Sequence, residues 1–199
     1  MSDCVHGIIL AAGLSTRMGK PKLMLEIDGI PIVARVMRAA LDSRLHRVVL
    51  VCGHDATDVE QILGDLCFHA RLSRTINHHP ELGMSSSLCI GMGKIPREAQ
   101  GAMIILADQP WLSSENIDRL LDVFCEDSER IVVPAVKGRK TTPVIFPRRF
   151  FRELSQVTGD IGGRGVLTQH RKSVVLVEMG ALYDDSDMDT AEDYRKLKK

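Results

Sequence analysis

A short loop near the N-terminus gathers the residue types that bind phosphate groups. An apolar run ends at Gly13, and the next nine residues include Ser15, Arg17 and Lys22. Small residues around Gly13 let a ligand approach the backbone closely, where amide groups can cradle phosphate oxygens. Arg17 offers a planar fork of donors, and Lys22 offers a mobile point charge. This pattern predicts that residues 10–22 bind a phosphorylated ligand.

Two common phosphate-binding loops do not fit the spacing of this segment. A Walker loop has four residues between its first glycine and its Gly-Lys pair, and Ser or Thr follows the lysine. Here five residues separate Gly13 from Gly19, and Pro21 follows Lys20. The G-x-G-x-x-G fingerprint of dinucleotide-binding proteins is also missing from this turn of the sequence. We therefore expect a nucleotide-binding loop of another class.

Carboxylates stand at two places where they could hold a divalent cation. Asp108 directly follows the strongest apolar run of the chain, residues 102–107. Mg²⁺ usually takes one or two protein carboxylates, while waters and phosphate oxygens complete its octahedron. Asp187 and Asp189 alternate near the C-terminus, so an extended backbone would put them on one side. We expect Asp108 and Asp189 to be the metal ligands, although an acidic helix start would also explain part of this segment.

Three serines and a glycine-rich loop suggest a second region that binds an anion. The serines at positions 85–87 open an apolar helix, where hydroxyls and unpaired amides of the first turn can meet an anion. Asp160 and Arg164 lie in the glycine-rich loop, and Arg164 could bind a phosphate through two parallel hydrogen bonds. His78 and His79 have no further ligand at a metal-binding spacing, so we interpret them as loop residues.

The elements that must position these residues alternate between strand and helix. Short β-branched runs predict strands, and apolar residues three or four positions apart predict helices. The expected strands are residues 7–12, 47–52, 70–76, 102–107, 131–136, 144–146 and 173–177, and the expected helices are residues 32–41, 57–66, 85–92, 114–124 and 190–197. This order is typical of a mixed, mostly parallel sheet with helices on both faces. We expect an α/β fold, a single-domain, three-layer α/β/α Rossmann-like architecture over residues 1–199.

Composition supports one domain and narrows the class of ligand. The chain has 199 residues, of which 44 % are hydrophobic and 26 % are charged, as in soluble globular proteins. The 26 basic and 26 acidic residues cancel, which argues against a dedicated nucleic-acid binder. Residues 130–172 nevertheless hold ten bases against two acids, and residues 173–199 hold seven acids against four bases. An anionic substrate beside a metal site and an ordinary solvated surface would both explain this separation of charge.

Cysteine usage and the N-terminal sequence predict a cytoplasmic protein. The five cysteines are an odd number without a C-x-x-C pair, which is typical of reduced, intracellular proteins. No basic segment precedes the first apolar run, so we expect no secretory signal. No stretch approaches the roughly 20 apolar residues that a membrane helix needs, so we expect no membrane association.

Residues 10–22 resemble a signature of the nucleotidyltransferases with a glycosyltransferase-A-like fold, L-A-A-G-x-S-x-R-M-G-x-x-K. Within that superfamily, the chain is similar to the molybdenum cofactor cytidylyltransferases. The resemblance implies the following nucleotide-binding residues: Leu10, Ala11, Ala12, Gly13, Ser15, Arg17 and Lys22. Of these, Arg17 and Lys22 would hold the triphosphate. Relatives that use GTP usually have glycine at the position of Ala12, so Ala12 favours CTP.

Other segments resemble further motifs of the same family. Residues 108–110 are similar to its D-Q-P motif, whose aspartate binds the metal, and residues 187–193 are similar to its D-x-D-T-P-E-D segment, with Ala191 replacing the proline. Residues 83–88 and 159–164 resemble its G-M-S-x-S-L and G-D-x-G-x-R motifs. The resemblance implies the following acceptor-binding residues: Met84, Ser85, Ser86, Ser87, Gly159, Asp160 and Arg164. Residues 137–143 depart from the family's glycine-rich G-x-x-G-x-P turn.

The activity implied by this resemblance is the transfer of CMP from CTP to molybdopterin. The acceptor would be the terminal phosphate of the molybdopterin-bound molybdenum cofactor, and pyrophosphate would be released. Arg17, Lys22 and Asp108 would be catalytic, with Mg²⁺ held by Asp108 and Asp189. Residues 1–110 would form the nucleotide-binding half and residues 111–199 the acceptor-binding half. A molybdoenzyme that receives the product would be the implied protein partner.

Other functions stay open at this point. An enzyme of this fold could join CTP or GTP to a different phosphorylated acceptor, such as a sugar phosphate. A non-catalytic carrier or insertion chaperone for the molybdenum cofactor would keep a pterin pocket without turnover. Nucleic-acid binding by residues 130–172 would give a steep salt dependence, but the neutral total charge disfavours it.

Overall fold

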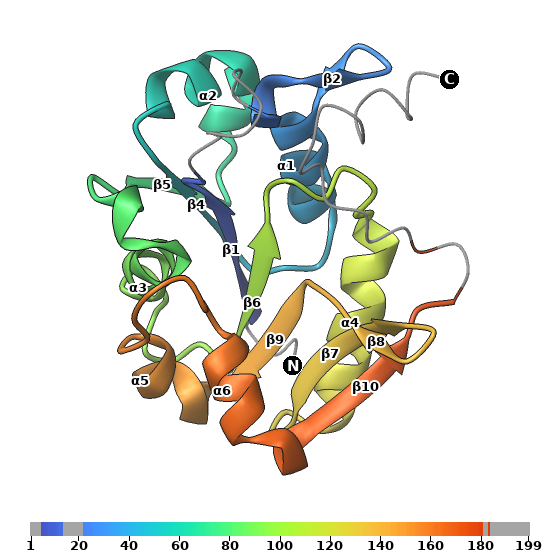
Figure 1. The fold of residues 1–199 in the computed structure, drawn as a ribbon. Coiled ribbons are helices and arrows are strands. Elements are labelled where there is room, and N and C mark those ends of the chain that lie inside the picture. The colour runs from blue at the N-terminus through green and yellow to red at the C-terminus, as the bar shows by residue number, and fades with distance from the viewer. Residues whose placement is uncertain (1–4, 14–21, 181–182, 184–199) are drawn as a thin grey trace.

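An eight-stranded sheet runs through the computed structural model, which describes residues 5–13, 22–180 and 183 (Figure 1). Its strands lie in the order β10-β7-β9-β6-β1-β4-β5, and β8 pairs with β7. The strands of this sheet are β1 (Val5–Ala11), β4 (Val48–Cys52), β5 (Leu72–Ile76), β6 (Gly101–Leu106), β7 (Ile131–Val136), β8 (Arg139–Lys140), β9 (Val144–Pro147) and β10 (Val174–Glu178). Strands β2 (Glu26–Ile27) and β3 (Ile30–Pro31) form a separate small hairpin.

Strand direction divides the sheet into two parts. Strands β5, β4, β1 and β6 are mutually parallel, whereas β9 lies antiparallel between β6 and β7. Strand β10 is parallel to β7. The expectation of a mixed, mostly parallel sheet is confirmed.

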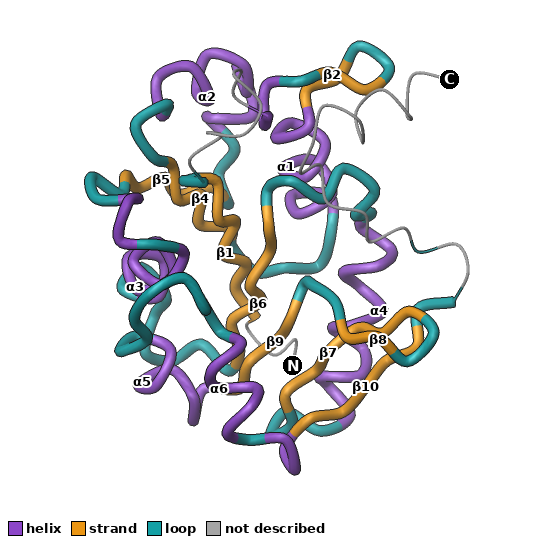
Figure 2. The backbone as a smooth tube through the Cα atoms, in the orientation of Figure 1, coloured by secondary structure: helices purple, strands orange, loops and turns teal. Residues whose placement is uncertain are grey.

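Helices cover both faces of the sheet, which makes three layers (Figures 1 and 2). The helices are α1 (Ile32–Asp42), α2 (Ala56–Leu63), α3 (Met84–Met92), α4 (Ser114–Glu126), α5 (Phe151–Leu154) and α6 (Arg164–Gln169). Alternation along β1 sends Ile9 into the apolar core under α1, α2 and α4, and sends Ile8 into the core under α3, α5 and α6. Both side chains are fully buried. None of the described helices has the length and apolar character that crossing a membrane would require.

Local sequence explains where the helices begin and end. The Ser113 hydroxyl accepts a hydrogen bond from the Asn116 amide, and the Asn116 side chain accepts one from the Ser113 amide, so α4 starts with a capping box. Helix α2 ends at Leu63, three residues before the expected end, because Gly64 takes a φ of 52° and a 3₁₀ turn follows. The expected helix over residues 190–197 lies outside the described residues.

The chain order places a crevice at one edge of the sheet. From β1 the chain winds outward through β4 and β5, and it then returns to place β6 on the other side of β1. Such a reversal between neighbouring parallel strands opens a crevice beyond their carboxyl ends, where α/β proteins bind ligands. Gly13 follows β1 and Asp108 follows β6, so both lie at this edge.

Candidate active site

An ion pair joins the two loops that leave the central strands. The Lys22 Nζ lies 2.6 Å from Asp108 Oδ2, although 86 residues separate the two along the chain. Each side chain is only 18 % exposed. Asp108 Oδ1 is buried and has no hydrogen-bond partner among the described residues. The carboxylate thus holds one cation and keeps a second oxygen unused, which fits a residue that can bind a divalent cation.

A cavity of about 810 Å³ surrounds this ion pair. Its lining comes from the ends of β1 and β6, the turn before α3, and the loop before α6: Leu10, Ala12, Gly13, Lys22, Leu23, Pro80, Glu81, Leu82, Gly83, Met84, Ser87, Leu106, Asp108, Gly159, Asp160 and Arg164. We call it the β1–β6 cavity. It has room for a nucleotide and presents backbone, one ammonium, one guanidinium and three carboxylates.

A second cavity, of about 480 Å³, adjoins the first on the same face of the sheet. Met84, Leu106 and Arg164 line both cavities, so these three residues mark their junction. We call the second one the β9 cavity, because Val144 and Phe146 of β9 form its floor together with Ile104 of β6.

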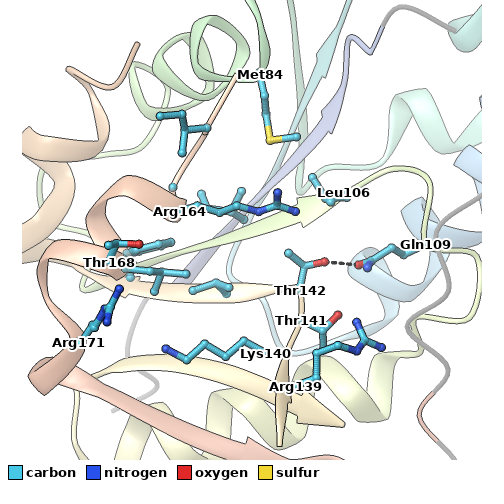
Figure 3. Close-up of a pocket in the computed structure, with 16 residues that line it drawn as sticks. Met84, Leu106, Gln109, Arg139, Lys140, Thr141, Thr142, Arg164, Thr168 and Arg171 are labelled. Carbon is cyan, nitrogen blue, oxygen red and sulfur yellow. Dashed lines mark hydrogen bonds between the residues drawn. The ribbon is translucent and has the colours of Figure 1, made fainter. Parts of the chain in front are cut away.

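Basic and hydroxyl side chains surround the apolar floor of the β9 cavity (Figure 3). The polar residues that line it are Gln109, Arg139, Lys140, Thr141, Thr142, Arg164, Thr168 and Arg171. The Thr142 hydroxyl donates a 2.6 Å hydrogen bond to Gln109 Oε1, which ties the loop after β6 to the turn before β9. The cavity can therefore receive an anion that has an apolar body.

The start of α3 is bound to the loop before α6. The Met84 amide donates to Asp160 Oδ1 at 3.0 Å, and the Gly162 amide donates to the Ser85 hydroxyl at 3.1 Å. The Ser85 amide also donates to the Gly159 carbonyl. Asp160 therefore accepts a hydrogen bond at a helix N-terminus, where the macrodipole favours a carboxylate. The two segments form one wall of the β1–β6 cavity.

The serines at the start of α3 make hydrogen bonds inside the protein. Ser85 and Ser87 are buried, and the side chain of the buried Asn77 donates to the hydroxyls of Ser86 and Ser87 at 2.8 and 2.9 Å. Neither Ser85 nor Ser86 lines either cavity, whereas Ser87 lines the β1–β6 cavity. These hydroxyls position the backbone around Met84, and their direct contact with an acceptor stays a prediction.

The structure brings most of the expected site residues together. Leu10, Ala12, Gly13, Lys22 and Asp108 line one cavity with five of the expected acceptor-binding residues: Met84, Ser87, Gly159, Asp160 and Arg164. Ala11 is buried in the core on the opposite face of β1. The expected site residues Ser15, Arg17 and Asp189 lie outside the described residues. The assigned roles of all these residues stay predictions.

Sequence reasoning missed several residues of the β9 cavity. Thr168 and Arg171 line it, and Lys140 joins them from β8. The excess of basic residues between positions 130 and 172 was the available signal for Lys140 and Arg171, but the sequence does not show which of those ten bases share a cavity.

The cysteines and the metal-ligand patterns offer no competing site among the described residues. No described cysteine lines either cavity, and burial raises the pKa of the Cys52 thiol to about 12. No group of three or more His, Cys, Asp or Glu side chains converges within the described ranges.

Known proteins resemble this chain over nearly its whole length. The chain is 30 % identical to the purine catabolism protein PucB of Bacillus subtilis, over 100 % of this chain and 98 % of that protein. It is also 30 % identical to the nicotine blue oxidoreductase of Paenarthrobacter nicotinovorans, over 98 % and 96 % of the two chains.

Solved structures and a family model agree on the fold and the family. The structure of Rv0371c from Mycobacterium tuberculosis superposes with a TM-score of 0.87 at 25 % identity, over 99 % of this chain and 98 % of that one. A manganese complex of that protein superposes with a TM-score of 0.82 at 23 % identity, over 98 % and 97 % of the two chains. The model of the MobA-like NTP transferase domain matches residues 7–174. The chain is therefore a nucleotidyltransferase with the glycosyltransferase-A-like fold, and it belongs to the MobA-like NTP transferase family.

Proposed function

We propose that this nucleotidyltransferase transfers CMP from CTP to the terminal phosphate of molybdenum-loaded molybdopterin and releases pyrophosphate. The observation that carries the proposal is the Lys22–Asp108 pair in the β1–β6 cavity, because it puts a cation and a carboxylate suited to a divalent cation beside a second, basic cavity. The β1–β6 cavity would hold CTP and the β9 cavity the pterin. Family membership supports the reaction class, and the sequence motifs support the choice of substrates.

The reaction is an in-line displacement at phosphorus. An oxygen of the acceptor phosphate forms a bond to the α-phosphorus of CTP, and the bond from that phosphorus to the pyrophosphate oxygen breaks. A phosphate monoester is already anionic near neutral pH, so no strong general base is required. Positioning and charge neutralisation then supply most of the catalysis.

Residues of both cavities would share this work. Lys22 would neutralise charge on the departing pyrophosphate, together with Arg17. Arg164, at the junction of the cavities, would orient the acceptor phosphate. Asp108 would hold Mg²⁺ with Asp189, and the unused Oδ1 of Asp108 supports this role. Mg²⁺ bound there supplies charge neutralisation to the phosphates.

Ala12 supports CTP over GTP. Ala12 lines the β1–β6 cavity just beyond β1, and Gly53, directly after β4, packs so close to it that a Cβ on Gly53 would lie 3.2 Å from the Ala12 Cα. The backbone here has little room to move away from a larger base. A pyrimidine is therefore the better fit beside Ala12.

The decisive experiment measures pyrophosphate release from each of the four NTPs, with and without molybdenum-loaded molybdopterin. We expect release from CTP only, and only when both the pterin and Mg²⁺ are present. Asp108→Asn removes the charge and keeps the shape, so it should lower kcat/KM on the order of 100-fold without unfolding the protein. A full rate in Asp108→Asn would refute the assigned metal site.

The alternatives give other outcomes in the same assay. Release with GTP, or with a sugar phosphate in place of the pterin, would indicate a different member of this reaction class. Tight pterin binding without any release of pyrophosphate would indicate a carrier or insertion chaperone. We place this reaction in the cytoplasm, where CTP is available and cysteines stay reduced.

A further inference from the structure

Asp108 and Gln109 are neighbours in the sequence that face different cavities. Asp108 lines the β1–β6 cavity, where it pairs with Lys22, and Gln109 lines the β9 cavity. Gln109 is a polar residue with only 3 % of its surface exposed. A buried amide side chain is costly unless its polar atoms are hydrogen-bonded, so the hydrogen bonds of Gln109 determine where it lies.

A hydrogen bond between two side chains connects β6 and β9 beyond the point where their backbones stop pairing (Figure 3). The antiparallel ladder between these strands ends with the pair Ile104 and Val144. Pro143, the next residue on the β9 side, has no amide hydrogen to donate. Beyond it, the Thr142 hydroxyl donates to Gln109 Oε1 at 2.6 Å. This hydrogen bond therefore takes over from the backbone in holding the loop after β6 to the turn before β9.

Thr142 is a fixed anchor for this hydrogen bond. Its carbonyl accepts a hydrogen bond from the hydroxyl of Tyr183, which is buried. The amide of the preceding residue, Thr141, donates to the Pro134 carbonyl of β7 at 2.9 Å. The turn before β9 is therefore held from two sides, and Gln109 is bonded to a firmly placed part of the fold.

The residues on either side of Asp108 determine where its carboxylate lies. Before it, the Ala107 amide donates to a carbonyl of β1, and after it, Gln109 is held by Thr142. The carboxylate itself has less support, since Oδ1 has no hydrogen-bond partner among the described residues and Oδ2 accepts from Lys22. The proposed function assigns that ammonium to the departing pyrophosphate. Once Lys22 has left Asp108, the neighbouring hydrogen bonds would keep the carboxylate in place.

We propose that Thr142 is a positioning residue for the metal site. Its hydroxyl holds Gln109, and Gln109 holds the backbone of Asp108 where the carboxylate can bind a divalent cation. This inference rests on the proposed function, because that proposal makes Asp108 a metal ligand. Thr142 lines the β9 cavity, but its hydroxyl serves the link to Gln109 and not the acceptor.

The test measures the affinity for Mn²⁺ without nucleotide or acceptor, by electron paramagnetic resonance of the free ion. Thr142→Val keeps the shape of the side chain and removes the hydroxyl, so Mn²⁺ should bind about tenfold more weakly, as expected when a metal ligand loses its support. Thr142→Ser keeps the hydroxyl and should stay within about twofold of the wild type. Thr141→Val is the matched control, because the Thr141 hydroxyl is in the same turn but forms no hydrogen bond with a described residue. It should bind Mn²⁺ as the wild type does.

Turnover separates support of the metal site from contact with the acceptor. With saturating Mg²⁺, Thr142→Val should lower kcat about tenfold and leave KM for the acceptor nearly unchanged, because the metal is misplaced in the transition state. Loss of a direct contact with the acceptor would instead raise KM and retain kcat. That second result would overturn the positioning role.

A second substitution breaks the same hydrogen bond from the other side. Gln109→Met removes the acceptor atom of the bond, so the double variant with Thr142→Val should bind Mn²⁺ no more weakly than Gln109→Met alone. Melting curves verify that each variant is folded. Additive losses, failure of Thr142→Ser to restore Mn²⁺ binding, or wild-type affinity in Thr142→Val would each overturn the proposal.

Failure of this inference can be told apart from failure of the proposed function by including Asp108→Asn. If Asp108→Asn weakens Mn²⁺ binding and Thr142→Val does not, the metal site stands and the positioning role falls. If both weaken it while CTP gives no pyrophosphate, the positioning role stands and the assigned reaction falls. If Asp108→Asn binds Mn²⁺ as the wild type does, the metal site and the positioning role fall together.

Discussion

At the scale of single residues, the Lys22 ammonium pairs with the carboxylate of Asp108, which we propose as a metal ligand. The ammonium lies 2.6 Å from one carboxylate oxygen, and both side chains are largely buried. A divalent cation and an ammonium compete for the same negative charge, since both cannot be close to it without repelling each other. Under the proposed function, Lys22 would therefore turn from Asp108 to the nucleotide when the metal and the triphosphate bind.

The substitution Lys22→Gln should change metal affinity and turnover in opposite directions. Without the competing ammonium, Mn²⁺ alone should bind about fivefold more tightly, the size expected for loss of a partly exposed ion pair. Pyrophosphate release should nevertheless fall on the order of 100-fold, because a cation that stabilises the leaving group is lost. Electron paramagnetic resonance of free Mn²⁺ measures the affinity of each variant for the metal. Lys94→Gln, an exposed lysine outside both cavities, is the control; weaker Mn²⁺ binding in Lys22→Gln would contradict the competition.

At the scale of elements, α3 and the loop before α6 act as one unit. Gly83 precedes α3 with a φ of 89°, which only glycine adopts readily. A Cβ at this position would lie 2.8 Å from the Gly159 carbonyl oxygen. The loop holding Asp160 therefore packs directly on the backbone of this glycine, and Arg164 follows the loop at the start of α6.

Replacing Gly83 by alanine tests this packing. Gly83→Ala should cost about 3 kcal/mol of unfolding free energy, from backbone strain together with the clash. It should also raise the acceptor KM several-fold, because the loop that carries Asp160 must shift. Gly64→Ala is the matched control: it has a φ of 52° but no atom within 4 Å of an added Cβ, so only about 1 kcal/mol should be lost and KM should not change. Equal effects of the two substitutions in urea unfolding and kinetics would argue against the contact.

Local sequence predicted the long, regular elements of this protein well. The strand expected at residues 102–107 is β6, Gly101–Leu106, and the helix expected after Ser113 is α4. Apolar periodicity and a capping serine are patterns of a few neighbouring residues, so they predict the position of such elements without knowledge of the tertiary structure. Short elements such as α6, with six residues, and β8, with two, were not predicted, because tertiary packing rather than propensity decides such segments.

The candidate site was predicted only in part, for a similar reason. Motifs single out Lys22, Asp108 and Arg164 one by one, but no local pattern shows that Lys22 and Asp108 touch across 86 residues. The serines at 85–87 also make contacts that no local pattern shows. Their sequence suggests hydroxyls offered to an anion, whereas the structure uses those hydroxyls to hold Asn77 and Gly162.

At the scale of the whole molecule, charge is neutral in total and uneven in space. Four bases of the segment 130–172 line the β9 cavity: Arg139, Lys140, Arg164 and Arg171. The others include Arg149, which pairs with Glu129 on the surface. A local concentration of cations in a cavity favours a small anionic ligand.

The central strand also carries a buried histidine that links global stability to pH. His6 in β1 is 3 % exposed, and its ring lies 5.2 Å from that of His46. Burial, His46 and Arg47 lower the pKa of His6 to about 4, while Glu98 acts in the opposite direction. The unfolded chain takes up this proton near the ordinary pKa of 6.5, whereas the folded chain resists it until about pH 4.

Stability should therefore fall as the pH drops from 7 towards 4, because in this range the unfolded state binds more protons than the folded state. From pH 7 to pH 5, His6 should account for a loss of about 2 kcal/mol in unfolding free energy. Urea unfolding at both pH values measures this loss. His6→Gln keeps a polar side chain but cannot titrate. Between pH 7 and pH 5, this variant should therefore lose about 2 kcal/mol less unfolding free energy than the wild type. His54→Gln, which alters an exposed histidine, should follow the wild type. If His6→Gln has the same pH dependence as the wild type, His6 titrates normally in the folded protein and β1 is not the origin of acid sensitivity.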